Sequence, residues 1–383
     1  MIDFLTEAQA VSGDLAALRH EFHRCPELGN HEFETAARIE AELNALGIPT
    51  VRMLETAVVG RLEGALPGPT VALRADMDAL SMQEVTGVDF ASRNPGVMHA
   101  CGHDLHMTAA LGAARLLAAR REEMRGNVVF LFQPDEEGDG GAQRMIEAGA
   151  LDGVDAVFGA HVSPDLPLGH VGVRYGKFYA ASDTINIVMH GRSAHGAERE
   201  KGVDALGAAA QLAVELIALP KRLEGERAVV SIGTFHAGTA GNALADRAEL
   251  LGIMRSLGPD ARRRLREMCV ETTEAVAAGW GARAELHLIE SYPGVVNHDD
   301  MTALAERAAR ALLGDQCVHV IDAPTMTTED FGYLLMERPG TFYHIGVGGD
   351  RPLHNTAVLP DDSAAAVAAA VHAAVLWKYM GNT

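Results

Sequence analysis

The chain has 383 residues, of which 48% are hydrophobic and 22% are charged, values typical of globular proteins. This composition excludes a disordered or collagen-like chain, and the length suits two or three domains. Acidic residues outnumber basic ones 52 to 32, which gives a formal net charge of −20. Because a negative field repels phosphate backbones and anionic lipids, we expect neither nucleic acid nor membrane as a general partner.

Nothing in the sequence has the pattern of a targeting segment. The first ten residues carry Asp3 and Glu7 and lack a basic segment before an apolar core. The longest apolar stretch, Ser363–Trp377, is alanine-rich and too short to span a bilayer, so it is predicted to be a helix. The cysteines are far apart, which favours a reducing cytoplasm over a disulfide framework. They are Cys25, Cys101, Cys269 and Cys317.

The first part of the chain has the apolar spacing of helices, and predicted strands and helices alternate after it. Apolar residues in Leu15–Phe22 and Phe33–Leu43 recur at helical spacing, and Gly47 ends the second of these helices. Further along, Thr108–Arg121 is a predicted helix between buried β-branched runs. The predicted strands are Ala57–Leu62, Thr70–Arg74, Asn127–Gln133 and Ala156–His161. This alternation indicates an α/β sheet with crossover helices.

A second pattern begins near Ala180. The predicted strands are Thr184–Gly191, Val229–Phe235, Ala248–Arg255 and Ala282–Ile289, and the predicted helices are Asp204–Leu219 and Asp260–Ala278. Their β-α-β-β-α-β order is typical of a ferredoxin-like arrangement. We therefore predict an α/β domain with a mixed sheet and helices on both faces, residues 1–179 and 292–383. A ferredoxin-like α+β domain, residues 180–291, is inserted into it.

Acidic residues gather at the ends of two predicted strands. Asp76 and Asp78 follow the first and can point toward one site, although a turn with solvated acids is the alternative. Asp135, Glu136 and Glu137 follow the second, and because adjacent carboxylates repel, they need water or a cation nearby. If one glutamate binds a metal ion, its neighbour can act as a base toward a metal-bound water. Surface solvation is again the alternative.

Histidines and a cysteine gather before the predicted helix Thr108–Arg121. Three histidines, an aspartate and a cysteine fall within eight residues of the segment Met98–His106. Thiolate and imidazole bind borderline-soft divalent metals, and the spacing of Cys101 and His103 lets both reach one ion from a tight turn. A lone buried cysteine is usually inert core, which suits the other three cysteines, but packing does not explain this density.

Two more histidines complete a candidate metal centre. His161 ends a predicted strand and His354 lies in Leu353–Asn355, and either alone would be read as structural. Together with the clusters above they make one thiolate, three imidazoles and one carboxylate, enough for two metal ions that share a water. The five candidate ligands are Cys101, His103, Glu137, His161 and His354.

These motifs resemble the M20 metallopeptidase family, within it the amidohydrolase branch of hippurate hydrolases, N-acyl-amino-acid deacylases and indole-acetyl-amino-acid hydrolases. The matching stretches run from His20–Gly29 to Leu353–Asn355, and the combination of Cys101–Asp104 with Glu136–Gly138 is specific to this branch. The resemblance implies that the five candidate residues ligate two divalent ions per subunit, manganese or zinc, with cobalt or nickel also possible.

The resemblance also implies roles for residues around the metals. Glu136 would be the general base, and Asp76 would hold a ligand in orientation. His195, in the inserted lid or dimerisation domain, would stabilise the oxyanion, often across a dimer interface. Asn242 and Arg255 match positions associated with the substrate carboxylate.

The sequence departs from the family pattern at three places. Arg199 and Glu200 stand where family members usually have proline followed by histidine or a similar residue, and Ala243–Ala245 stands where Val-Ile-Pro is more frequent. Asp135 replaces a residue that is commonly small. The first two lie in the inserted domain, so they bear on substrate choice more than on metal chemistry.

The expected function is metal-dependent hydrolysis of the amide bond of an N-acyl amino acid or a similar small carboxylated amide, by a homodimer or homotetramer. One alternative is an M20-type dipeptidase or carboxypeptidase. Another, from a different class, is a catalytically silent metal-binding or interaction protein. Its signature would be the loss of Glu136 or of a ligand, and all of these residues are present.

Overall fold

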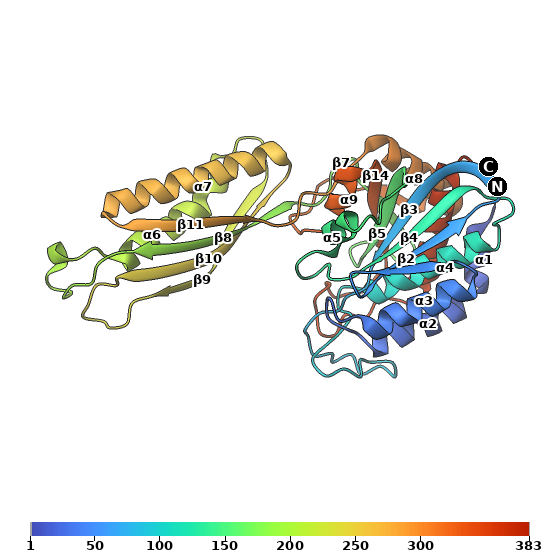
Figure 1. Cartoon of the computed structure of the whole chain (residues 1–383), viewed down its shortest axis with the longest axis horizontal. Helices are drawn as coiled ribbons and strands as arrows, with labels where there is room; N and C mark the ends of the chain where they lie inside the picture. Colours follow the sequence, from blue (N-terminus) through green and yellow to red (C-terminus); the bar gives the residue numbers. More distant parts are fainter. Residues whose placement is uncertain (1, 383) are drawn as a thin grey trace. The chain divides into compact units, whose positions relative to one another are not determined.

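The computed structural model describes residues 2–382, which divide into two units. Of the described residues, the larger unit contains 2–176, 297–322 and 330–382, and the inserted unit contains Lys177–Val296 and Ala323–Glu329. Figure 1 shows the sheet and helices of each unit. A short two-stranded sheet is formed by β7 (Gly176–Lys177) and β12 (Val296–Asn297).

The larger unit is built on a mixed sheet, in which the described residues form eight strands ordered β1-β2-β4-β3-β5-β14-β6-β13. The strands are β1 (Thr50–Met53), β2 (Ala57–Glu63), β3 (Leu66–Asp76), β4 (Arg125–Gln133), β5 (Ala156–Ser163), β6 (Val171–Val173), β13 (Val318–Val320) and β14 (Gly340–Gly346). Neighbours among β4, β3, β5 and β14 pair in parallel, whereas β2 and β6 are antiparallel to β4 and β14. The carboxyl ends of the four parallel strands therefore meet at one edge of the sheet.

Helices cover both faces of this sheet. They are α1 (Phe4–Ala10), α2 (Ser12–Arg24), α3 (Phe33–Ala45), α4 (His103–Ala118), α5 (Gly141–Glu147), α8 (Asp299–Leu313), α9 (Phe331–Glu337) and α10 (Ser363–Tyr379), with a 3₁₀ turn η3 (Asp315–Cys317). Phe158 of β5 contacts Tyr379 of α10, with ring centroids 5.7 Å apart. The next residue, Gly159, faces Phe331 of α9 so closely that a Cβ would lie 2.6 Å from that ring. Because successive strand residues point to opposite faces, α9 and α10 lie on opposite sides.

The inserted unit has the predicted β-α-β-β-α-β order. Its elements are β8 (Ala181–His190), η1 (Arg199–Lys201), α6 (Ala205–Ala218), η2 (Leu219–Arg222), β9 (Ala228–Ala237), β10 (Arg247–Ser256), α7 (Pro259–Trp280) and β11 (Arg283–Glu290). The sheet order β11-β8-β10-β9, antiparallel throughout, is that of a ferredoxin-like fold. Apolar residues of α6 and α7 share one core with β8 and β10. The predicted fold class is confirmed.

One helix boundary differs from its prediction in a way that matters for the site. Helix α4 begins at His103 instead of Thr108, so His103 and His106 lie in its first turn. The residue before it, Gly102, has a left-handed φ of 82°, which turns the chain into the helix. The alanine-rich pattern that marked the helix starts only after these polar residues. Within the described residues, no helix combines the length and apolar character of a membrane span.

Candidate metal centre

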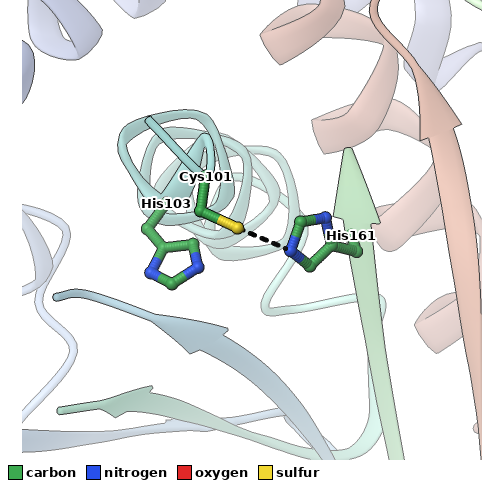
Figure 2. Close-up of side chains that lie close together, drawn as sticks. All are labelled: Cys101, His103 and His161. Atoms are coloured by element: carbon green, nitrogen blue, oxygen red, sulfur yellow. Dashed lines mark hydrogen bonds between the residues drawn. The ribbon is translucent and has the colours of Figure 1, made fainter. Parts of the chain in front are cut away.

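The structure brings the five predicted ligands together in the larger unit. Cys101 lies just before α4 and His161 lies on β5, with 3.4 Å between Sγ and Nε2 (Figure 2). His354, in the loop after β14, places Nε2 3.3 Å from Cys101 Sγ and 3.1 Å from Glu137 Oε1. His103 Nε2 lies 4.0 Å from the same Glu137 oxygen. Residues from four separate segments thus meet beyond the carboxyl ends of parallel strands.

Ligand atoms within this cluster form overlapping sets. Cys101, His103 and His161 offer one set whose atoms all lie within 4.8 Å of one another, and Cys101, Glu137 and His354 offer another. Cys101 belongs to both sets. Two neighbouring ion positions that share one ligand are therefore compatible with this arrangement, and the donor types suit borderline-soft divalent ions.

The orientation of two imidazoles fits a metal. His103 Nδ1 donates a hydrogen bond to the Asp78 carbonyl at 2.8 Å, and His161 Nδ1 donates to the Val162 carbonyl at 2.8 Å. Each ring therefore directs Nε2 into the cluster. His103 Nε2 is buried and has no hydrogen-bond partner among the described residues. Because buried polar atoms normally have a hydrogen-bond partner, this unpaired nitrogen is consistent with a metal ligand.

Two acidic residues hold this arrangement in different ways. Asp76 Oδ1 accepts a hydrogen bond from His106 Nδ1 at 2.5 Å and lies 3.8 Å from His103 Nδ1. Asp78 makes the shorter contacts to the predicted ligands, because its Oδ1 lies 3.2 Å from His103 Nδ1 and its Oδ2 accepts from the Glu137 amide at 2.9 Å. Asp78 therefore links two candidate ligands through one side chain.

The sequence predicted neither a role for His106 nor the contacts that Asp78 makes to two candidate ligands, although both residues lie inside the clusters that the sequence identified. His106 Nε2 accepts a hydrogen bond from the Val162 amide at 2.9 Å, so His106 directs neither nitrogen into the cluster. Asp76 is in turn held by Arg74 at 2.5 Å, and Arg74 also contacts Asp330 at 2.7 Å. The signal for these contacts was the spacing of two acids at a strand end, but their partners depend on tertiary packing.

The charges of the cluster favour a cation. Burial alone lowers the pKa of His103, but Asp76, Asp78 and Glu137 outweigh it and raise the pKa to about 10. Burial and then the carboxylates of Glu137 and Glu136 raise the pKa of the Cys101 thiol well above its usual value. In the absence of metal, protons therefore occupy these groups. A divalent ion bound here would replace those protons and stabilise the thiolate.

Glu136 lies beside the candidate ligands without belonging to either of the two sets that contain Cys101. It is only 6% exposed, and its carboxylate forms a further set with His103 and Glu137 within 4.8 Å. It follows Asp135, whose φ of 58° is in the left-handed region. A second glutamate next to a candidate ligand is the geometry in which a proton acceptor can reach a water at the cluster.

The remaining predicted residues lie in the inserted unit. His195 and Asn242 are exposed neighbours, since the Gly196 amide donates to the Asn242 carbonyl at 2.8 Å and His195 forms an isolated bridge with Ala243. These segments adjoin the end of β10 at Arg247, which pairs with His190.

Arg255 lies near the other end of the same strand. It pairs with Ser182 on β8 and is half-buried, and this burial lowers its pKa. The distance along β10 from Arg247 to Arg255 is about 27 Å at the usual rise per residue. The structure thus groups His195 with Asn242 and separates both from Arg255.

The chain is similar to known proteins over most of its length. Residues 72–378 match the model of peptidase family M20/M25/M40. The chain is 39% identical over 362 residues to an N-acetylcysteine deacetylase from Bacillus subtilis, covering 92% of this chain and 93% of that protein. It is 34% identical to thermostable carboxypeptidase 1 from Saccharolobus solfataricus, covering 94% of each.

A solved structure is similar over nearly the whole length. It is a dinuclear metal-binding peptidase of the M20 family from Bacillus subtilis, with a TM-score of 0.89 and 36% sequence identity. The alignment covers 98% of this chain and 99% of that one. The shared fold, the cluster of candidate metal ligands and the family match lead to one conclusion: the chain belongs to peptidase family M20/M25/M40.

Proposed function

We propose that this enzyme hydrolyses the amide bond of N-acyl amino acids, or of similar small carboxylated amides, with the help of two divalent metal ions. The observation that carries the proposal is the meeting of a thiol, three imidazoles and a carboxylate beside the further glutamate Glu136. Similarity to a deacetylase of N-acetylcysteine supports the choice of an N-acyl amino acid. Similarity to a dinuclear peptidase supports two ions.

The five residues Cys101, His103, Glu137, His161 and His354 would hold the ions. Thiolate and imidazole ligands suit zinc, cobalt and nickel, whereas the carboxylate ligand also suits manganese. We therefore propose manganese or zinc as the bound metal. When bound, such ions supply Lewis-acid activation of a water and of the substrate carbonyl. Asp78 contacts both His103 and Glu137 and so fixes their positions relative to one another.

The protein's own groups would carry the proton and orient the substrate. Glu136 takes a proton from the attacking water and delivers it to the nitrogen of the leaving amine, so that it is regenerated at the end of the reaction. His195 donates a hydrogen bond to the developing oxyanion, a contribution of about 3–4 kcal/mol for one such donor. Arg255 and Asn242 bind the substrate carboxylate. Asp76 orients His106 and, through it, the strand end at Val162.

The decisive variant is Glu136→Gln, which keeps the size of the side chain and removes the base. We expect turnover to fall by about 10²–10⁴-fold while the metal content per chain stays near that of the wild type. Glu137→Gln is the matched comparison, because it removes a ligand and should lower the metal content. Normal turnover by Glu136→Gln would exclude the proposed mechanism.

A second candidate activity is the cleavage of peptides, since a relative of 34% identity is a carboxypeptidase. A panel of N-acetyl amino acids, dipeptides and N-blocked peptides, assayed with metal analysis on the same sample, separates the two. We expect the N-acetyl amino acids to be hydrolysed fastest, and the activity to be removed by a chelator and restored by metal. A metal-loaded protein that cleaves none of them would favour the silent metal-binding protein.

We propose that the enzyme acts as a homodimer or homotetramer in the cytoplasm. A small substrate is much shorter than the separation of about 27 Å along β10, so one copy's Arg255 and His195 do not contact the same molecule. A second copy would supply the missing His195 and Asn242. The reducing cytoplasm would keep the Cys101 thiol available as a ligand.

Complementation tests this shared site. Chains carrying Glu136→Gln and chains carrying His195→Ala are each expected to be inactive, but mixed oligomers formed by co-expression should regain activity. A monomer in sedimentation, or mixed oligomers without activity, would contradict the shared site.

A further inference from the structure

Asp135 occupies an unusual position directly before the glutamates of the site. It is only 5% exposed and its φ of 58° lies in the left-handed region, which a residue with a Cβ adopts at a cost. The conformation at Asp135 sets the direction in which the chain continues to Glu136 and Glu137. Something must therefore hold this residue in place.

The carboxylate of Asp135 fixes this residue in place, because it accepts hydrogen bonds from three donors. Asp135 Oδ2 accepts hydrogen bonds from Asn30 Nδ2 at 2.8 Å, from Arg144 at 2.9 Å and from the Asp139 amide at 3.3 Å. Arg144 also donates to Asn30 Oδ1 at 2.8 Å, which closes a triangle of side chains. Since Asn30 precedes α3 and Arg144 lies on α5, the triangle ties the glutamate turn to two separate segments.

The surroundings of the carboxylate leave it little freedom. A Cβ built on Gly29 or on Gly138 would lie 2.1 Å or 2.2 Å from Asp135 Oδ1, so the carboxylate packs directly against two glycine backbones. The backbone is held as well, because the Asp135 amide donates to Glu32 Oε1 at 3.0 Å and its carbonyl accepts from the Gly140 amide at 3.1 Å. The side chain and the backbone of Asp135 therefore both contribute hydrogen bonds that fix the turn containing Glu136 and Glu137.

We propose that Asp135 is a positioning residue that, with Arg144 and Asn30, fixes the turn carrying Glu136 and Glu137. The proposal rests on the function proposed above for these two glutamates. Asp78 holds the same turn from the cluster side through the Glu137 amide, so the turn is fixed from two directions. Removal of the Asp135 carboxylate would leave the contact with Asp78 and weaken the attachment on the other side. If the base Glu136 were then displaced by about 1 Å, the reaction would be roughly 10²-fold slower.

The test compares four single variants, and the double variant of Asp135→Ala with Arg144→Ala, in the full-length enzyme. Asp135→Ala removes the carboxylate, Asp135→Asn keeps its shape and one acceptor, and Arg144→Ala removes the partner. Glu40→Gln is the control, because it breaks a comparable ion pair with Arg52 on α3 and β1 of the same unit, away from the glutamate turn. Each is assayed for kcat, KM, the rate at which a chelator removes zinc, and the thermal unfolding of the metal-free protein.

We expect Asp135→Ala to lower kcat by about 10- to 100-fold with KM within about threefold, and to release zinc about 10-fold faster. Asp135→Asn should recover part of both losses. The effects of Asp135→Ala and Arg144→Ala should be strongly non-additive in the double variant, because they break the same contact. Glu40→Gln should lower thermal stability to a similar extent while leaving kcat and zinc release unchanged.

A purely structural role would give a different pattern. In that case Asp135→Ala and Glu40→Gln would both lower thermal stability and neither would change kcat or zinc release, which would overturn the proposal. Additive effects of Asp135→Ala and Arg144→Ala would overturn it as well. If the wild-type enzyme hydrolysed no amide, the proposed function would fail, and the zinc-release rates would still decide whether Asp135 positions Glu137.

Discussion

Gly102 is expected to be indispensable between the candidate ligands Cys101 and His103. Its φ of 82° is in the left-handed region, and a Cβ added there would lie 2.5 Å from Cγ2 of Val162. Gly102→Ala therefore combines a strained backbone with a steric clash. Relief of the clash requires a shift of the turn, which would move the sulfur of Cys101 relative to the imidazole of His161.

The magnitude follows from these two effects. A left-handed conformation costs a residue with a Cβ about 1–2 kcal/mol, and overpacking a filled interior costs about 1–3 kcal/mol. We therefore expect Gly102→Ala to lower the free energy of unfolding by about 2–5 kcal/mol. Gly96 is a matched control, because its φ is 76° and a Cβ there would meet nothing within 4 Å. Gly96→Ala should cost only the backbone contribution, about 1–2 kcal/mol.

The assay is urea unfolding of the metal-free protein, followed by circular dichroism, together with chelator competition for bound zinc. Gly102→Ala should lose more stability than Gly96→Ala and should bind zinc more weakly, whereas Gly96→Ala should bind zinc as the wild type does. Equal losses of stability in the two variants, with equal zinc affinity, would refute the role assigned to the contact with Val162.

The buried carboxylates of Glu32 and Asp76 give two further predictions. Burial raises the pKa of Glu32 from 4.5 to about 7, so between these pH values the folded protein retains a proton that the unfolded chain has released, and stability falls as the pH rises. Glu32→Gln should therefore raise the free energy of unfolding by about 3 kcal/mol at pH 8 and leave it nearly unchanged at pH 4. An equal gain at both pH values in urea denaturation would contradict this. Asp76→Asn removes one of the two carboxylates that pair with the buried Arg74 guanidinium and leaves Asp330 as the other, so it should cost about 1–3 kcal/mol in the metal-free protein. A loss below 1 kcal/mol would show that Arg74 is compensated elsewhere.

Periodicity and motif chemistry were sufficient to predict much of this protein from its sequence. The β-α-β-β-α-β order of the inserted unit can be read locally because each element carries its own apolar pattern. The residue types at Cys101, His103 and Glu137 likewise indicate metal chemistry without knowledge of their neighbours. The family and the reaction class follow from these motifs, and the comparisons confirm both.

Only the tertiary structure decided which groups meet. His354 contacts a cysteine 253 positions away, and the strand β14 that leads to it had not been predicted. The contacts of Asp78 and Asp135 could not be predicted either, because an acidic side chain in a turn is solvated or buried depending on what packs against it. The net charge of −20 can be read from composition alone, but the fold determines which of those carboxylates lie in the candidate cation site and which contact it, because chain segments far apart in sequence meet there.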